Sequence, residues 1–359
     1  MVPKPNGNTR RIRRPSFMYV RRTIKPQVML LDSWRLFAIT VPWSALVVYL
    51  HEIRGWETLS VPFLPVSTIG IAVSLYLGFK STSAYNRWWE ARSIWGEVVN
   101  NSRTWANYAH NMVHDADYRT QPAICRELIV RHIAWINALA YQLRKNSRLK
   151  ISDNMHIFDF RRDLKHPDYH ADPQSYLKHL TEEERTHIPN HANPATHILR
   201  LQGEHLRALA KQGLLSDFRF VEMTSHLGKF YDCQGKSERI KNTPFPRQIA
   251  YFGTVFTWIF ILLLPIAFVD AFEDETARHH LDHLLAVEYM FMLVPFTSLI
   301  AWIFYVIEKV SDSSEDPFEG GASDVPISTL CRTIEIDMKQ FLNEGDIPPP
   351  LKPLDGIAY

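Results

Sequence analysis

The residues whose spacing could do chemistry lie first in the motif RWWEAR, where Glu90 follows Arg87 by three positions and Arg92 follows it by five. Residues three apart lie on one face of a helix, so Arg87 and Glu90 are predicted to form an ion pair within that helix. The chain contains no nucleophile paired with a base, no P-loop and no G-x-G-x-x-G. We therefore predict that the protein is not an enzyme and has no catalytic residue.

Histidines offer a second chemistry, metal binding. Residues 156–197 hold seven of the sixteen histidines, but no pair there has the helical or ribbon context that fixes a tetrahedral zinc site. His279 and His283 stand four apart in the segment RHHLDH, where a metal or proton sensor is the alternative to an exposed polar loop. Solvated loops are the favoured interpretation of both segments, and we predict no metal site and no cofactor.

Four long uncharged runs decide the class of protein. Residues 58–79 carry no charge over 22 positions, residues 249–269 over 21, and residues 289–307 over 19. Each reaches the roughly 17–25 residues that cross the hydrocarbon of a bilayer. Residues 36–50 form a shorter fourth run of 15, which Arg35 and His51 can extend toward the membrane surface. The alternative, buried helices of a soluble protein, requires an aqueous core that hides three such runs.

The charges beside these runs predict the orientation. Residues 1–33 hold eight Lys or Arg against one acid, and the start of the chain lacks the apolar core of a cleavable signal peptide. The positive-inside rule then places both termini in the cytoplasm of a bacterial inner membrane, with four spans between them. The three cysteines, Cys125, Cys233 and Cys331, fall on the reducing side and are predicted to be ordinary small apolar residues.

The long segment between the second and third runs has a helical pattern. Ile129, Ile133 and Ile136 recur at helical spacing, residues 146–195 suggest short helices joined by loops, and Gly213 is predicted to end a helix. No Pro or Gly separates Lys80 from the apolar run before it, so the second spanning helix is predicted to continue into this segment. The predicted parts are an N-terminal segment 1–33, transmembrane helices in 34–79, a cytoplasmic helical domain 80–248, transmembrane helices in 249–307 and a cytoplasmic tail 308–359.

The second run could line a passage. Ile71, Leu75 and Phe79 stand four residues apart on one helix face, and around a symmetry axis they would form three stacked apolar rings. Such a constriction can gate ions by dewetting. Ordinary helix packing is the alternative, because nearly every residue of the run is apolar.

Three motifs together resemble the bestrophin family in its prokaryotic branch. They are LGFKSTSAYNRWWEARSIWG after the second run, ERIKNTPFP before the third, and EDPFEGGASDVPI after the fourth. The resemblance covers about residues 20–345 and implies a homopentameric ion channel with one axial pore. It implies that Ile71, Leu75 and Phe79 form an apolar neck, although Leu75 replaces an aromatic residue of animal members. It also implies a cytoplasmic aperture near residues 215–221, for which Phe218 is the expected residue.

Animal bestrophins hold calcium partly through acids that follow the PF motif. Asp316 and Asp324 fit that pattern, whereas Gly320 and Gly321 stand where acids are expected. Two carboxylates cannot fill the six to eight oxygen positions around calcium. The clasp is therefore predicted to be degraded, with Asp316 and Asp324 as capping and turn residues that hold the tail against a neighbouring subunit.

The sequence thus predicts an all-α membrane protein with four transmembrane helices per subunit and a helical cytoplasmic domain, assembled as a homopentamer. Its expected partners are four identical subunits, the lipid bilayer and small monovalent ions; the net charge of +2 argues against nucleic acid. The resemblance implies chloride and other anions as the favoured ions, and the positive edge of an aromatic ring can favour anions, although only Phe79 offers one here. A cation channel of the same fold and a membrane-anchored helical scaffold are the alternatives.

Overall fold

The computed structural model describes residues 26–115, 117, 119–145, 172–280, 282–320 and 324–352; the side chains of residues 26–32, 57 and 284 are also left undescribed. Most of the predicted N-terminal segment, Gly321, and three histidines of the 156–197 segment lie outside the described residues. No strand occurs in the described ranges, where a single bridge joins His114 and Thr120. The predicted all-α class is confirmed.

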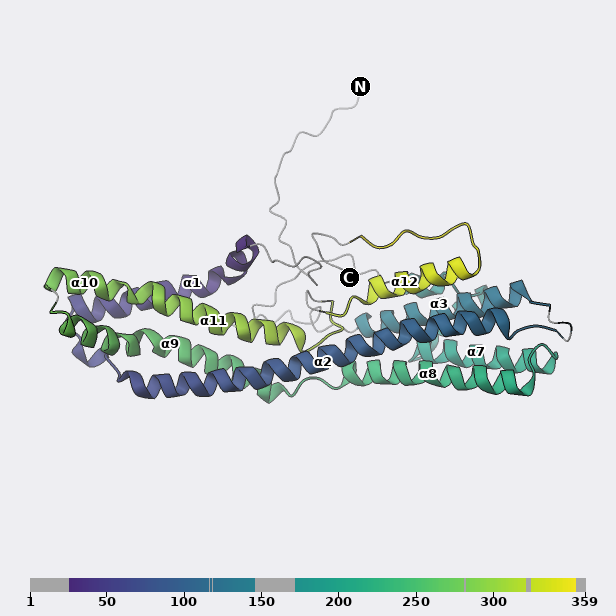
Figure 1. Ribbon diagram of the computed structural model, residues 1–359, viewed down its shortest axis with the longest axis horizontal. Coiled ribbons are helices and arrows are strands. Elements are labelled where there is room, and N and C mark those ends of the chain that lie inside the picture. The colour runs from purple at the N-terminus through teal and green to yellow at the C-terminus, as the bar shows by residue number, and fades with distance from the viewer. Residues whose placement is uncertain are drawn as a thin grey trace, which may run out of the picture.

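One helix, α2 (Phe63–Asn111), runs nearly the whole length of an elongated molecule (Figure 1). Its 49 residues span about 74 Å at the usual rise of a helix. The predicted continuation of the second apolar run into the next segment is therefore confirmed. The helix begins five residues later than the run, because Pro62 adopts an extended backbone and residues 57–59 form a separate 3-10 turn.

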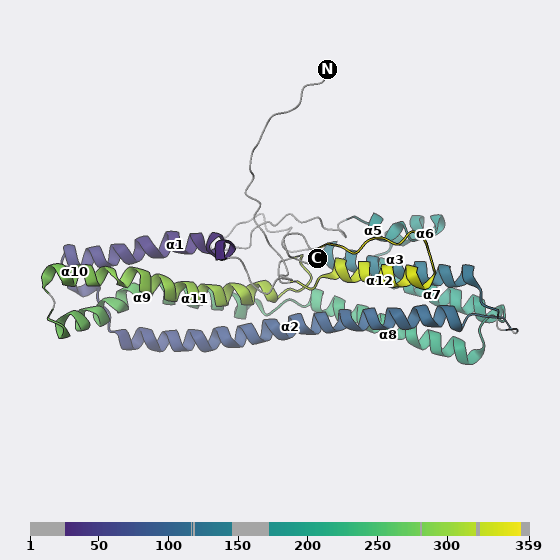
Figure 2. The same ribbon diagram turned by 45° about the horizontal axis from the view of Figure 1, so that its top comes forward.

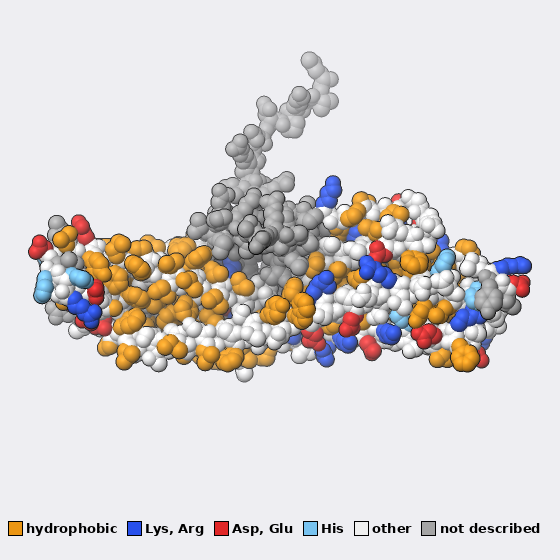
Figure 3. All heavy atoms as spheres, viewed as in Figure 1, with side chains coloured by type: hydrophobic (Ala, Val, Ile, Leu, Met, Phe, Trp, Pro, Cys, Tyr) orange, Lys and Arg blue, Asp and Glu red, His pale blue; other side chains and the backbone are white. Residues whose placement is uncertain are grey.

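The first half of α2 packs with helices at the apolar end of the molecule, where Figure 2 shows the same grouping from another side. Four helical segments there are long and apolar enough to cross a membrane, and each overlaps one of the four predicted runs. Figure 3 shows hydrophobic side chains covering this half, with charged and histidine side chains at its outer tip. The other helices of this half are α1 (Pro26–Val48), α9 (Arg247–Arg278), α10 (His283–Phe291) and α11 (Leu293–Ser314).

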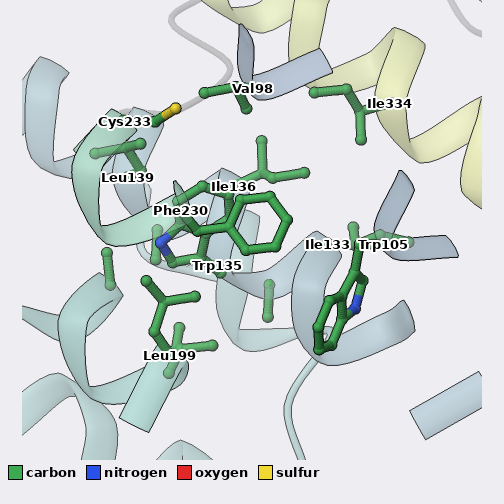
Figure 4. Packing of buried hydrophobic residues seen from close by; sticks show 14 of the residues in the cluster. Val98, Trp105, Ile133, Trp135, Ile136, Leu139, Leu199, Phe230, Cys233 and Ile334 are labelled. Atoms are coloured by element: carbon green, nitrogen blue, oxygen red, sulfur yellow. The ribbon is translucent and has the colours of Figure 1, made fainter. Parts of the chain in front are cut away.

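The second half of α2 belongs to a polar bundle with its own core. Trp105 of α2, Trp135 of the adjacent helix and Phe230 meet at the centre of this core (Figure 4). The residues predicted to recur on one face, Ile129, Ile133 and Ile136, are all buried. The remaining helices are α3 (Pro122–Lys145), α5 (Gln174–Leu177), α6 (Glu182–His187), α7 (Pro194–Lys211), α8 (Asp217–Asn242) and α12 (Ile327–Phe341).

Local signals of the sequence appear in this bundle as predicted. Gly213 has a φ of +75° and follows the last turn of α7, a backbone conformation in which a side chain is strained. Residues 172–195 contain the predicted short helices. The three cysteines are free and buried, and burial raises the pKa of each thiol, that of Cys233 to about 11. Their predicted role as small apolar residues is confirmed.

Candidate pore-lining surface

Ile71, Leu75 and Phe79 lie on a face of α2 that no other described part of the subunit covers. Their side chains are 71%, 62% and 67% exposed, although all three are large and apolar. Residues of the same turns on the opposite side, Val73 and Leu77, are buried against α9. Successive members of the exposed set are rotated by about 40° around the helix, so the three form one stripe about 12 Å long.

Small side chains flank this stripe. Ala72, Ser74 and Gly78 are also exposed on α2. Small residues allow helix backbones to approach closely, whereas lipid contacts are made well by large side chains. The outer faces of α9 and α11 differ from this pattern, since their exposed residues are large, as in Phe252, Phe256, Ile259, Leu262, Phe296, Leu299, Ile303 and Ile307. The composition of the α2 face therefore suits contact with other copies of α2 better than contact with lipid.

A buried charge pair lies directly behind the inner end of the stripe. Lys80 follows Phe79 but points into the bundle, where its fully buried Nζ donates to Glu308 Oε1 at 3.0 Å. Thr254 Oγ1 donates to the same oxygen at 2.6 Å. Gly253 leaves room for this arrangement, because a Cβ there would lie 3.2 Å from the Lys80 side chain. Three helices, α2, α9 and α11, are thus joined at one buried point.

The tail beyond α11 is held by basic residues of the same chain. Asp324 Oδ2 accepts from Arg144 Nη1 at 3.4 Å and from the backbone of Gly320, and both acid and guanidinium are buried. Asp316 Oδ2 lies 3.1 Å from Arg247 Nη2. A further, partly buried pair joins Lys241 of α8 to Glu319 at 2.8 Å. Each acid proposed from the calcium pattern therefore has a cation of its own subunit as a partner, and Asp324 also serves as a turn residue.

Glu315 is the most perturbed acid of this tail. It is 1% exposed; its Oε1 accepts from Arg247 Nη1 at 3.1 Å, while its Oε2 has no hydrogen-bond partner. Burial raises its pKa to about 7, with the negative charges of Asp312 and Asp316 adding to the effect. The positive charges of Lys80 and Arg247 oppose this rise but do not reverse it.

Phe218 occupies the other end of the polar bundle from the α2 stripe. It lies in the first turn of α8 and is 90% exposed, whereas Leu215, just before the helix, is buried. An almost fully exposed Phe on a well-packed helix is a candidate for contact with something outside the subunit. The structure thus leaves both proposed constrictions, Ile71, Leu75 and Phe79 on α2 and Phe218 on α8, uncovered within one subunit.

The predicted ion pair of the RWWEAR motif is wrong. Arg87 instead donates to the carbonyl oxygens of Ile240 and Thr243, at the C-terminal end of α8. Glu90 pairs with Arg239 of the same helix. A guanidinium is stabilised by the unpaired carbonyls and negative dipole end of a helix, which an i,i+3 carboxylate on an exposed surface cannot match.

The described histidines were the candidates for a metal site. Among the residues that the structure describes, no group of three or more His, Cys, Asp or Glu side chains is arranged to bind a metal. The rings of His191 and His197 are in contact, with centroids 3.6 Å apart and planes tilted by 39°. His279 ends α9 and pairs with Glu275, whereas His283 begins α10, so their spacing of four does not place them on one helix.

Sequence analysis missed the pairs that join distant segments. Lys80 and Glu308 are each the first charged residue after an apolar run. This position is a weak signal that the two charges meet. Arg144 and Lys241 carry no such signal, because nothing in their surroundings distinguishes them from the other basic residues of polar helices. Their roles follow only from the folding of the tail onto α3 and α8.

Together, the apolar half, the spanning helices and the continuous α2 define an all-helical membrane protein. The chain belongs to the bacterial and fungal bestrophin family: the family model described as Bacterial/Fungal Bestrophin protein matches residues 9–340. The predicted membership is confirmed.

Similar proteins agree with this assignment. A voltage-dependent anion channel-forming protein of Mesorhizobium japonicum is 26% identical over 359 residues, which is all of this chain and 97% of the relative. YneE of Escherichia coli, also named a voltage-dependent anion channel-forming protein, is 28% identical over 80% of each chain. The crystal structure of a bacterial bestrophin homologue from Klebsiella pneumoniae shares the fold, with a TM-score of 0.70, 24% identity, and coverage of 86% of this chain and 97% of that one. The relatives are thus named as channel-forming proteins and not as enzymes.

Proposed function

We propose that this protein is the pore-forming subunit of a homopentameric channel that conducts chloride and other small monovalent anions. The observation that carries the proposal is the stripe of Ile71, Leu75 and Phe79, which is large, apolar and uncovered in the subunit while the opposite face of α2 is packed. The names of the Mesorhizobium and Escherichia relatives support an anion as the conducted ion.

In this proposal the stripe forms the neck and the gate. Five copies of α2 meet at the axis through the small residues that flank the stripe, and the three large side chains make stacked apolar rings. An ion must lose part of its hydration to pass about 12 Å of such a lining, and a narrow apolar passage can close by expelling water. Phe218 then forms the cytoplasmic aperture at the far end of the polar bundle.

The membrane arrangement is part of the proposal. The apolar half lies in a bacterial inner membrane, residues 80–248 form a cytoplasmic domain, and both termini are cytoplasmic. The excess of Lys and Arg in residues 1–33, against one Arg each in residues 51–57 and 271–283, supports this orientation. The buried Lys80–Glu308 pair then lies where the neck meets the cytoplasmic domain, at the inner edge of the membrane.

A planar-bilayer experiment tests the function. Purified full-length protein is expected to carry current whose reversal potential in a salt gradient follows the anion. Leu75→Ala widens the narrowest ring and is expected to raise unitary conductance or open probability at least about two-fold. Leu299→Ala on α11 is the matched control, since it makes the same substitution on an exposed face proposed to contact lipid, and should leave the current unchanged.

The same recordings separate the alternatives. A reversal potential that follows sodium or potassium would establish a cation channel of the same fold. Silent reconstituted pentamers, or equal effects of Leu75→Ala and Leu299→Ala, would reject the proposed neck and favour a membrane-anchored scaffold.

A further inference from the structure

Helix α8 carries a continuous exposed face that begins at Phe218. Lys236 follows Phe218 by 18 residues, which is five full turns, so both side chains leave the helix on the same side. Residues between them at the same angle, Ser225, Lys229 and Asp232, are exposed as well. The opposite side of the helix, with Phe230, is buried in the core.

Helix α2 continues its own exposed stripe into the polar bundle. Beyond Phe79, the positions within the same arc of the helix as far as residue 100 are Thr82, Asn86, Trp89, Ser93, Glu97 and Asn100, and all six are exposed. Apart from Trp89, the stripe is therefore polar beyond the inner end of the proposed neck. Glu97 is the ionised member of this set.

The two exposed faces lie side by side. Glu97 Oε2 of α2 is 3.3 Å from Lys236 Nζ of α8, and Glu90, about two turns nearer the proposed neck on α2, is paired with Arg239. Both pairs are solvent-exposed, with about half of each side chain accessible. One surface thus runs from the α2 stripe to Phe218, and two acid–base pairs cross it.

We propose that the pairs Glu97–Lys236 and Glu90–Arg239 determine ion specificity. They balance the charge on the wall of the cytoplasmic passage between the proposed neck and Phe218, and so set which sign of ion reaches the neck. This inference rests on the proposed function, because an axis that passes both Phe79 and Phe218 must also pass the surface between them. Each pair repeats in every subunit, so it forms a ring of alternating charges. Removal of one member leaves a ring of five equal charges, and such rings are a general means of ion selection.

Exposed pairs of this kind contribute little to stability. The more important effect of two such pairs on one exposed face is the electric field that they create. The field of an unpaired ring extends over a Debye length, about 30 Å at 0.01 M salt and about 8 Å at 0.15 M. The effect on ion selection must then weaken as salt is added.

The test uses reversal potentials of the full-length channel in salt gradients at low and at high ionic strength. Lys236→Gln, which unmasks Glu97, is expected to lower the chloride-to-sodium permeability ratio at least about two-fold at low salt. Glu97→Gln, which unmasks Lys236, is expected to raise the ratio by a similar factor. The exchange Glu97→Lys with Lys236→Glu restores the balance and is expected to return the ratio toward that of the unaltered protein.

Arg126→Gln is the control, because Arg126 of α3 pairs with Glu344 beyond α12 and its loss removes the same charge away from this surface. It should leave the ratio unchanged. Conducting channels in which Lys236→Gln and Glu97→Gln leave the ratio unaltered, or shift it in the same direction, would overturn the inference while Leu75→Ala still supports the neck. Silence of the unaltered protein would instead reject the proposed function, and the inference with it.

Discussion

At the residue scale, neighbouring positions on α2 have opposite environments. Phe79 is exposed at the inner end of the proposed neck, while Lys80, one residue on, is fully buried against Glu308. A step of one residue turns the side chain by about 100°, so a single helix can present a lining on one side and a charged anchor on the other. Lys80 and Glu308 lie where the apolar half meets the polar bundle. The tail acid Glu315, paired with Arg247, lies at the same junction.

Glu315 predicts a pH dependence of stability. Its pKa is raised to about 7 in the folded protein from 4.5, so between these values the folded protein holds a proton that the unfolded chain has released. The free energy of unfolding must then fall as pH rises through that window, by up to about 3 kcal/mol. Glu315→Gln stays neutral and should lose most of this slope, as measured by thermal unfolding in detergent. An unchanged slope in the variant would show that other groups cause it.

At the element scale, α2 belongs to both halves of the molecule. Its buried stripe packs against α9 through Val73 and Leu77 in the apolar half and continues through Trp95 and Trp105 in the polar core. Because α2 is one unbroken helix that is packed in both halves, we expect a displacement in the polar bundle to reach the proposed neck. The anchor of this helix at the junction is the contact of Lys80 with α11.

The Lys80–Glu308 pair predicts strong coupling between two helices. Lys80→Met leaves a carboxylate without its cation and should destabilise the protein by about 3–5 kcal/mol, as breaking a buried pair generally does. Lys80→Met combined with Glu308→Gln removes both charges and should be more stable than Lys80→Met alone. Unfolding midpoints of the two single variants and the double variant measure this coupling. Losses that simply add would show that the two groups act independently.

At the scale of the whole molecule, the C-terminal tail connects both halves. It leaves α11, meets Arg247 at Glu315 and Asp316, and then inserts Asp324 beside Arg144 at the end of α3. Basic side chains of this subunit thus supply the positive charge that a divalent ion would supply to a cluster of acids. In the part of the chain that the structure describes, these ion pairs hold the tail.

Calcium removal is accordingly predicted to have no effect on the channel. Addition of a calcium chelator to either side of the bilayer should leave the open probability equal to its value before addition, within measurement error. Asp316 and Asp324 already have Arg247 and Arg144 of the same subunit as partners. Arg144→Gln is the informative variant, since it removes the guanidinium beside Asp324 without altering an acid. A loss of current on chelation in the unaltered protein would show that the clasp is intact.

The sequence by itself determined the class of the protein, because the length of an apolar run and the period of a helix are local properties. The four helices long enough to span a membrane, the unbroken α2 and the end of α7 at Gly213 were all predicted in this way. The membership of the family was predicted from three local motifs. The stripe of Ile71, Leu75 and Phe79 followed from the same helical period.

Only the tertiary structure decided which charges meet. Arg87 has a partner on α8 rather than Glu90, and the Glu97–Lys236 pair joins residues 139 positions apart. No local pattern specifies such contacts, because the strength of an ion pair depends on distance and burial, which are set by how the helices pack. Burial also depends on how the helices pack. The sequence therefore shows which residues of α2 share a face, but only the tertiary structure shows which face is packed and which is exposed.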